Sequence, residues 1–461
     1  MTLPTKLLQA IAHDGGGHVV LVVGAGTSVE PPTNLPSSSE CAEEVHRRLL
    51  ADGVLTSGAC QHPQDLSAVA DAVFAVTGHQ ADVVLRLPRE RFVTAKPNQG
   101  HRFSAALLRE RAISSVLTLN FDLAFSNALT TVGAAEDVAQ VRGPEDQAQL
   151  GAHNLVYLHR TANHDPELWI LRSEALVHEW TDSWEEAIAN RVLTSPVVVF
   201  AGLGSPAAVL TETTKRLRRI LKEGVKVFQV DPIEREESSF ADQLQIKSGD
   251  YIRLGWVEFM NRLAERVTIE QLDKLQKACY ELCNAHRWPH EDVHRLLDSL
   301  ATGGLLLLGA VRARWMLEEG PYLTQYECDV DHIADVTLAV RVIERESGTS
   351  ARIDEDGAVE FWEGTFLRTV IAFVSARGKW RWGAIEPRVE RARQSWRTRQ
   401  VDVRKVVVVG ATGAREAISP PETIVGSSAA GDIIRGASAI QYFAIDDLRR
   451  DEARVSELMS A

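Results

Sequence analysis

Five apolar runs, at residues 18–23, 115–119, 155–158, 196–201 and 225–230, constrain the fold of this chain more than any other feature of its sequence. Their apolar character is continuous rather than alternating, which is typical of parallel strands buried on both faces. Long amphipathic stretches separate the runs and predict crossover helices, such as the one at 39–51. The pattern predicts a doubly wound α/β sheet.

From residue 256 to about 317 the pattern is helical, and the pair Gly303 and Gly304 predicts a turn between two helices. Strands are predicted again at 337–344, 359–362, 369–375, 405–409 and 439–445. We therefore expect a Rossmann-like α/β domain at 1–262, a helical connector at 263–328 and a smaller C-terminal α/β domain at 329–461.

Composition narrows the class of protein. The chain has 461 residues, 45% of them hydrophobic, which is enough for more than one core, and its net charge of −13 argues against a uniformly basic nucleic-acid coat protein. No apolar run is long enough to span a membrane, and the N-terminal stretch lacks the pattern of a signal peptide. The odd number of scattered cysteines, five, predicts reduced thiols in the cytoplasm.

Small or polar residues follow the first two apolar runs. Gly24, Ala25, Gly26, Thr27 and Ser28 form a glycine-rich loop whose backbone N–H groups could approach a pyrophosphate, although a plain strand-to-helix turn is an equal alternative. Asn120 and Asp122 follow the second run, at the edge where doubly wound sheets bind ligands. Asp122 taken alone is better explained as a cap for the next helix.

Three more segments repeat this arrangement. His159 follows the third run, where a general base would lie, although a lone histidine is more often structural. Gly202, Gly204 and Ser205 form a small-residue turn after the fourth run, and Asp231 follows the fifth. All five segments come at the carboxyl ends of predicted strands, so we expect them along one edge of the sheet.

This ordered set, GAGTS, TLNFD, LH, GLGS and VDP, resembles the SIR2 (sirtuin-like) family, in particular its bacterial antiviral-defence branch, over residues 15–262. The resemblance implies NAD as the substrate. It implies that residues 24–28 cradle the phosphates, that Asn120 and Asp122 hold the nicotinamide end, and that His159 is a base acting on a ribose hydroxyl. It also implies that Gly202, Gly204, Ser205 and Asp231 line the adenosine half.

The chain departs from the deacylating sirtuins in three places. After the glycine-rich loop, residues 29–34 read VEPPTN where those proteins have a Pro-Asp-Phe-Arg-like segment. No cysteine lies between Cys60 and Cys279, so their four-cysteine zinc module is absent. Arg160 follows the histidine where the family has glycine, and a positive φ there would cost an arginine about 1 kcal/mol. Without the zinc lobe, water suits the site better than an acyl-lysine as the nucleophile.

The expected function is therefore an NAD+ glycohydrolase effector of a bacterial antiphage system, which kills its host by abortive infection and so needs gating. The alternative is a catalytically weak NAD-binding or scaffold subunit, with a protein deacylase as a third, disfavoured choice. The family implies a homo-oligomer and a partner such as a HerA-like ATPase, a short Argonaute or a phage protein. The C-terminal domain would sense the trigger or mediate assembly.

Two further clusters of residues could bind a metal ion or a partner. Cys279, Cys283, His286, His290 and His294 could suggest zinc, but Pro289 interrupts the pattern, and buried cysteines with surface histidines are the better interpretation. Residues 377–405, from Arg377 to Lys405, carry ten Lys and Arg against three acids with three interleaved tryptophans. This segment predicts contact with nucleic acid or an acidic partner, or else a solvated helix face. No complete nuclease motif accompanies it, and the glycines at 410 and 413 indicate a plain turn.

Overall fold

The structure is a computed structural model. It describes residues 3–11, 17–172, 184–193, 195–203, 216–217, 219–221, 225–315, 326–355, 357–376, 405–410, 440–444, 455–456 and 459. The chain divides into two compact units, Met1–Arg266 and Val267–Ala461. Within the described residues, no helix is long and apolar enough to cross a membrane.

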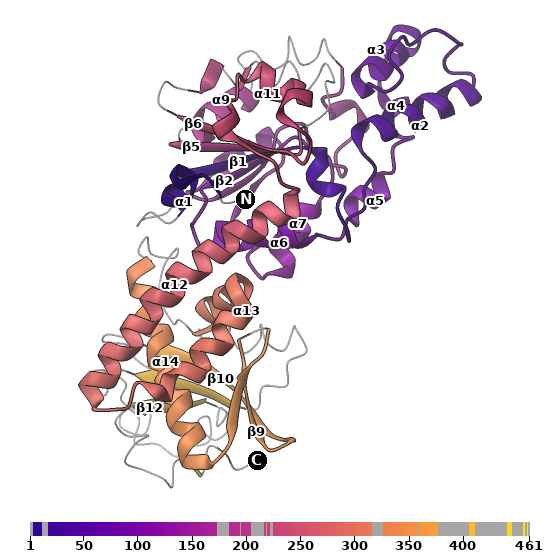
Figure 1. Cartoon of the computed structure of the whole chain (residues 1–461). Helices are drawn as coiled ribbons and strands as arrows, with labels where there is room; N and C mark the ends of the chain where they lie inside the picture. The colour runs from indigo at the N-terminus through magenta and orange to yellow at the C-terminus, as the bar shows by residue number, and fades with distance from the viewer. Residues whose placement is uncertain are drawn as a thin grey trace. The chain divides into compact units, whose positions relative to one another are not determined.

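A seven-stranded parallel sheet forms the centre of the first unit (Figure 1). Its strands are β1 (Val19–Val23), β2 (Ser115–Thr118), β3 (Ala139–Val141), β4 (Asn154–Tyr157), β5 (Val197–Ala201), β6 (Lys226–Val230) and β7 (Tyr251–Ile252). Their order across the sheet is β3-β4-β2-β1-β5-β6-β7. The predicted doubly wound sheet is confirmed, and the five apolar runs are β1, β2, β4, β5 and β6.

Helices cover both faces of this sheet. On one face Val20 and Val22 of β1 pack in one core with Ile188 of α9 (Trp184–Val192) and Phe240 of α11 (Ser239–Gln243). On the other face, the Tyr157 hydroxyl lies 3.0 Å from the Ser126 hydroxyl in α7 (Ala124–Thr131), which packs with α6 (Gln99–Arg109). All five residues of β1 are buried, as a central parallel strand requires.

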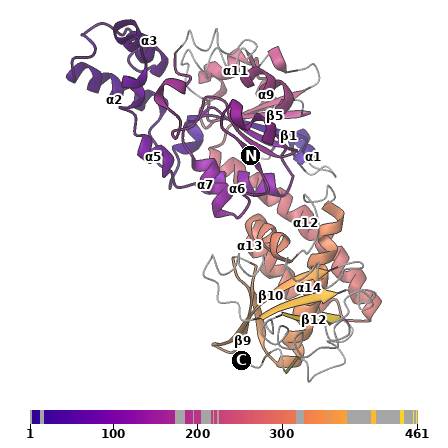
Figure 2. The same ribbon diagram turned by 180° about the vertical axis from the view of Figure 1, so that it is seen from behind.

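A lobe of helices lies beside the sheet in the first unit, and Figures 1 and 2 show it from opposite sides. It contains α2 (Ser38–Ala51), α3 (Leu66–Thr77), α4 (Ala81–Val84) and α5 (Arg89–Val93), while α1 (Thr5–Ile11) lies against β1. A capping box starts α2, because the Ser37 side chain accepts from the Glu40 N–H and the Glu40 side chain accepts from the Ser37 N–H. The lobe has an apolar core of its own, which includes Val45, Val69 and Val83.

The second unit holds a smaller mixed sheet. Its strands are β8 (Ser350–Ile353), β9 (Val359–Glu363), β10 (Phe366–Ala376), β11 (Lys405–Gly410) and β12 (Ile440–Ala444), in the order β12-β11-β10-β9-β8. Strands β10 to β12 are parallel to one another, and β8 and β9 pair antiparallel. The predicted smaller C-terminal α/β unit is confirmed, and the basic residues 377–404 lie outside the described residues.

Three long helices contribute to the core of this unit: α12 (Trp256–His286), α13 (Glu291–Trp315) and α14 (Tyr326–Ser347). The predicted strand at 337–344 is wrong, because these residues belong to α14. Val336, Leu338, Val340 and Ile343 are all buried, and residues 336–343 are apolar except for Thr337 and Arg341, so this stretch has no continuous polar face to reveal a helical period. Gly304 has φ 62° and ψ −157° inside α13, so the helix is interrupted at the predicted pair of glycines.

Cys279 and Cys283 lie fully buried in the core that α12 shares with α13 and α14. Burial raises the pKa of the Cys279 thiol, so the reactive thiolate is scarce at neutral pH. We expect iodoacetamide to leave both cysteines unmodified in the native protein and to modify both in guanidinium chloride. Peptide mapping by mass spectrometry measures this, and fast native labelling of either cysteine would contradict the buried placement.

Candidate functional site

Four strands of the first sheet end level with one another. Val23 lies opposite Thr118 on one side and Ala201 on the other, and Thr118 lies opposite Tyr157. The residues that follow each strand therefore meet at one edge of the sheet, which is where doubly wound folds bind ligands. Sequence reasoning predicted this edge as the site.

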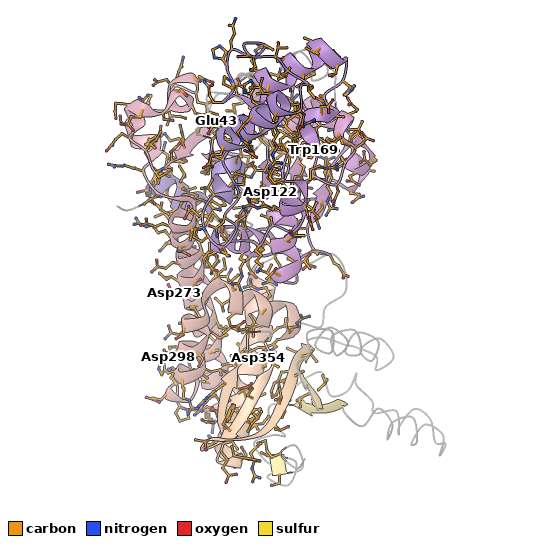
Figure 3. The ribbon with its side chains drawn as sticks, turned by 90° about the vertical axis from the view of Figure 1, so that its right-hand side faces the viewer. Glu43, Asp122, Trp169, Asp273, Asp298 and Asp354 are labelled. Carbon is orange, nitrogen blue, oxygen red and sulfur yellow. The ribbon has the colours of Figure 1, made fainter. Side chains whose placement is uncertain are left out.

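A cavity of about 140 Å³ lies at this edge. Its lining residues are Gly24, Ala25, Ser28, Leu35, Pro36, Ser38, Cys41, Leu66, Ser67, Leu87, Phe92, Leu119, Asn120, Phe121, Asp122, His159, Ile170, Leu171, Gly202 and Leu203. The structure thus brings together four of the five predicted segments, and Figure 3 shows Asp122 in the interior of the first unit. The helical lobe, the segment that precedes it and residues 170–171 contribute the rest of the wall.

The glycine-rich loop packs directly on the turn after β5. The Gly24 N–H donates to the Ala201 carbonyl and the Gly26 N–H to the Gly202 carbonyl, each at 3.0 Å, and the Thr27 N–H donates to the Gly24 carbonyl. A Cβ at Gly26 would lie 2.7 Å from the Gly202 Cα. The glycines therefore serve this close backbone approach, and because three loop N–H groups are already engaged, the phosphate role of residues 24–28 stays a prediction.

Four side chains at the site, those of Thr27, Ser28, Asn120 and Asp122, are joined by hydrogen bonds. The Ser28 hydroxyl donates to Asp122 Oδ2 at 2.9 Å, and Asn120 Nδ2 lies 3.4 Å from both the Thr27 and the Ser28 hydroxyl oxygens. Thr27 in turn donates to the Gly24 carbonyl at 2.8 Å. The loop after β1 and the loop after β2 are thereby locked together at the cavity.

His101, which sequence reasoning missed, lies against this cluster and faces the Ser28 hydroxyl. The Asn98 N–H donates to His101 Nδ1 at 3.2 Å, so in the neutral ring the proton is on Nε2, which faces the Ser28 hydroxyl at 3.5 Å. Burial lowers the pKa of His101 to about 3, which keeps the ring neutral. Asn98 also donates to the Thr27 carbonyl at 2.8 Å. The signal in the sequence is an Asn-x-x-His pair at the start of α6.

Asp122 combines both roles that the sequence allowed. Its Oδ1 accepts from the N–H of Ala124, the first residue of α7, at 2.9 Å, while Oδ2 accepts from Ser28 beside the cavity. Burial raises the pKa of this carboxyl, and the hydrogen bonds from Ala124, Ser28 and Asn120 act in the opposite direction. The structural and functional interpretations therefore describe the same side chain.

His159 lines the cavity and is almost fully buried. Burial and the neighbouring Arg160 charge lower the pKa of His159 to about 4, while a hydrogen bond with the Leu119 backbone raises it. A bond that favours the protonated form is one that the ring donates, so the nitrogen facing Leu119 carries the proton. The other ring nitrogen is then an acceptor at neutral pH.

Arg160 adopts the left-handed conformation that its position was expected to need, with φ 76°. This region costs a non-glycine residue about 1 kcal/mol. The following residues hold the turn in place, because the Thr161 N–H donates to His164 Nδ1 at 3.1 Å and the Ala162 N–H to the Phe121 carbonyl at 2.8 Å. The backbone after His159 is strained and is fixed by its neighbours.

The helical lobe gives the cavity an apolar wall. Leu66, Leu87 and Phe92 line it together with Cys41, whose thiol pKa burial raises to about 12. Phe121 stacks on Trp169 with ring centroids 4.2 Å apart, and Trp169 belongs to the core of the lobe. This stacked pair joins the lobe to the loop that carries Asn120 and Asp122.

Of the remaining predicted site residues, the structure describes Asp231 but not Gly204 or Ser205. Asp231 follows β6 and does not line this cavity; its Oδ1 accepts from the Ile233 N–H at 3.3 Å, and burial raises the pKa of its carboxyl. Gly204 and Ser205 lie outside the described residues. Within the part of the chain that the structure describes, no three His, Cys, Asp or Glu side chains gather as a metal site would require.

The charge of the cavity restricts what it can hold. Among its described lining residues, Asp122 is the one carboxylate and there is no lysine or arginine. An apolar wall with one amide, one carboxylate and one imidazole suits an aromatic group that is uncharged or positive. Among these described residues, the diphosphate of a dinucleotide would find no side-chain cation.

Comparisons with known proteins give structural matches only. No protein-family model and no curated protein matches the chain. A mutant Sir2 homologue in complex with ADP-ribose is 19% identical with a TM-score of 0.34, and covers 57% of this chain and 96% of its own. A Sir2 homologue in complex with NAD is 18% identical with a TM-score of 0.33, and covers 58% and 94%. At these values, the chemistry must be judged from the residues of the site.

The strain at Arg160 can be measured with two variants. Arg160→Gly and Arg160→Ala both remove the charge beside His159, but only glycine adopts φ 76° without a steric cost. We expect the glycine variant to be more stable than the alanine variant by about 1 kcal/mol in chemical denaturation. Equal stability of the two variants would argue against the left-handed conformation.

The pKa of His159 predicts a dependence of stability on pH. Because its pKa is about 4 in the folded protein and 6.5 in the unfolded chain, unfolding takes up a proton between these values, and stability falls as the pH falls through this window. From pH 7 to pH 5, the wild type should lose roughly 2 kcal/mol of unfolding free energy relative to His159→Gln. Parallel pH profiles of the two proteins would contradict the burial of a neutral imidazole.

Proposed function

We propose that the chain is an NAD+ glycohydrolase of the SIR2 (sirtuin-like) type, which cleaves NAD+ to nicotinamide and ADP-ribose. The observation that carries the proposal is the meeting of Asn120, Asp122 and His159 in one cavity at the carboxyl edge of the sheet, in the motif order of that family.

The charges of the site suit this reaction. The pyridinium ring of NAD+ carries a positive charge, and Asp122 is the one carboxyl group among the described lining residues. As the bond between C1′ of the ribose and the pyridinium nitrogen breaks, its electron pair moves to that nitrogen and positive charge develops on the ribose. A buried carboxylate in an apolar cavity stabilises such a charge more than the same group does in water.

Water is the proposed nucleophile. Its oxygen bonds to C1′, and its proton leaves to the unprotonated ring nitrogen of His159 or to solvent, which yields ADP-ribose. Neutral His159 can accept a proton, although a pKa of about 4 makes it a weak base. A cationic ribose needs little activation of the water, so positioning contributes more than basicity.

The low pKa also favours a second candidate, a catalytically weak NAD-binding or scaffold subunit. Arg160 lowers the pKa of His159, and its left-handed backbone occupies a position where the resembled family has glycine. A weak subunit would bind NAD+ and turn it over slowly, and Arg160→Gly would then raise its rate.

Gating in a bacterial antiphage system forms part of the proposal. The second unit would sense a trigger or mediate assembly, with a HerA-like ATPase, a short Argonaute or a phage protein as the activating partner. Residues 377–405 supply a basic segment for an acidic partner or nucleic acid. Growth arrest on expression, absent in a site variant, would support this role.

Hydrolysis of NAD+ by the purified chain, alone or with its activating partner, is the test of the proposed activity. We expect Asn120→Ala and His159→Ala to lower the rate by about 100-fold or more, because each removes a positioned polar group from the cavity. Release of nicotinamide, followed by chromatography, measures the rate, and circular dichroism checks the fold.

Asn190→Ala is the matched control, because Asn190 is exposed on α9 and is not among the lining residues. It should retain the wild-type rate. Wild-type rates in both site variants would refute the assignment of the site, and binding of NAD+ without turnover in the wild type would favour the weak subunit.

A further inference from the structure

The segment at residues 29–36 connects the glycine-rich loop to α2 and forms one wall of the cavity through Leu35 and Pro36. Three groups from other parts of the first unit hold it. Asn98 Nδ2 lies 3.4 Å from the Glu30 carbonyl, Arg91 donates to the Asn34 carbonyl at 2.8 Å, and the Leu35 N–H donates to the Ser28 carbonyl at 3.0 Å. The wall is therefore tied to the loop that carries Ser28.

The side chain of Glu30 makes a different contact. Its carboxylate Oε1 accepts from the Val257 N–H at 3.1 Å, in the first turn of α12. The first N–H groups of a helix have no partner within the helix, and a carboxylate at this end is also favoured by the helix dipole. Gly255 permits the approach, since a Cβ there would lie 3.3 Å from the same oxygen.

The first turn of α12 reaches the site by a second route. The Trp256 ring packs against His101 with centroids 6.5 Å apart and against Phe125 with centroids 6.2 Å apart. Gly100 makes room for it, because a Cβ at Gly100 would lie 2.3 Å from the indole Nε1. The first turn of α12 thus contacts the cavity wall through Glu30. It also contacts His101, which faces the Ser28 hydroxyl.

We propose that Glu30 is a positioning residue, which fixes the cavity wall at 29–36 to the first turn of α12 and makes the shape of the cavity depend on that turn. α12 runs without a break from Trp256 to His286, across the boundary between the two units at residues 266 and 267. Any event that frays or displaces its first turn would remove this hydrogen bond from the wall and leave the wall held by Asn98, Arg91 and the Ser28 carbonyl alone, so the helix offers a route for regulation of the site.

The proposal rests on the proposed function only for its effect on activity, so the first test is independent of NAD+. Hydrogen exchange of the full chain, followed by mass spectrometry, reports the Leu35 and Val257 amides. In Glu30→Ala both should exchange about tenfold faster than in the wild type, because a charge-assisted hydrogen bond is lost. Glu30→Gln keeps an acceptor oxygen and should stay close to the wild type.

Glu258→Ala is the matched control, because it removes a carboxylate from the same turn of α12, whose ion-pair partner is Arg262 rather than the loop. It should leave Leu35 exchange unchanged. If Glu30→Ala does not fold, Glu30→Asp gives the same test. Its side chain is one methylene shorter and holds the carboxylate back from the Val257 N–H. Unchanged Leu35 exchange in the folded variant would overturn the proposal.

Steady-state kinetics then separates positioning from general loss of structure. For Glu30→Ala we expect the KM for NAD+ to rise about tenfold with a smaller change in kcat, and Glu30→Gln to restore it. If KM rises and kcat falls by the same factor, in Glu30→Gln as well as in Glu30→Ala, the positioning role is overturned. If the wild type hydrolyses no NAD+ while Leu35 exchange still responds to Glu30→Ala, the proposed function fails and the role of Glu30 stands.

Discussion

The close approach of two backbone turns is the contact on which the site depends. The loop after β1 reaches the turn after β5 because Gly24, Gly26 and Gly202 lack side chains, and a Cβ at Gly202 would lie 2.6 Å from the Thr27 nitrogen. Gly202 also has φ 67°, where other residues are strained. This contact closes the edge of the sheet between β1 and β5 and places Thr27 and Ser28 beneath the cavity.

A polar cluster without cations is built on that contact. Ser28 bonds Asp122, Asn120 Nδ2 lies near Ser28 and Thr27, and a neutral His101 supports Ser28 from α6. Buried polar groups are costly unless they are paired, so these mutual hydrogen bonds allow a carboxylate to stay in an apolar cavity. The same burial lowers the pKa of His159 and His101, and so both imidazoles are neutral at physiological pH.

Structural support and function meet in the same residues. Asp122 accepts from the first N–H of α7 and also lines the cavity, and Glu30, next to the cavity wall, accepts from the Val257 N–H in the first turn of α12. Arg160 carries backbone strain directly after His159, a combination that proteins tend to keep at functional positions. The site is therefore sensitive to helices whose own residues do not line the cavity.

The sequence by itself determined the central strands and the edge of the sheet at which the candidate site lies. Continuous apolar runs identify buried parallel strands, and the polar segments that follow these runs lie at the carboxyl edge of the sheet. It could not determine α14, whose residues at 336–343 are apolar except for Thr337 and Arg341 and so show no clear helical period, or the short edge strands β3 and β7, which have too few residues for a pattern. It also missed two residues. His101 contacts Ser28 from the start of α6, and Glu30 joins the cavity wall to the first turn of α12. Only the tertiary structure decided these contacts, because hydrogen bonds between distant segments depend on packing in three dimensions and leave no period in the chain.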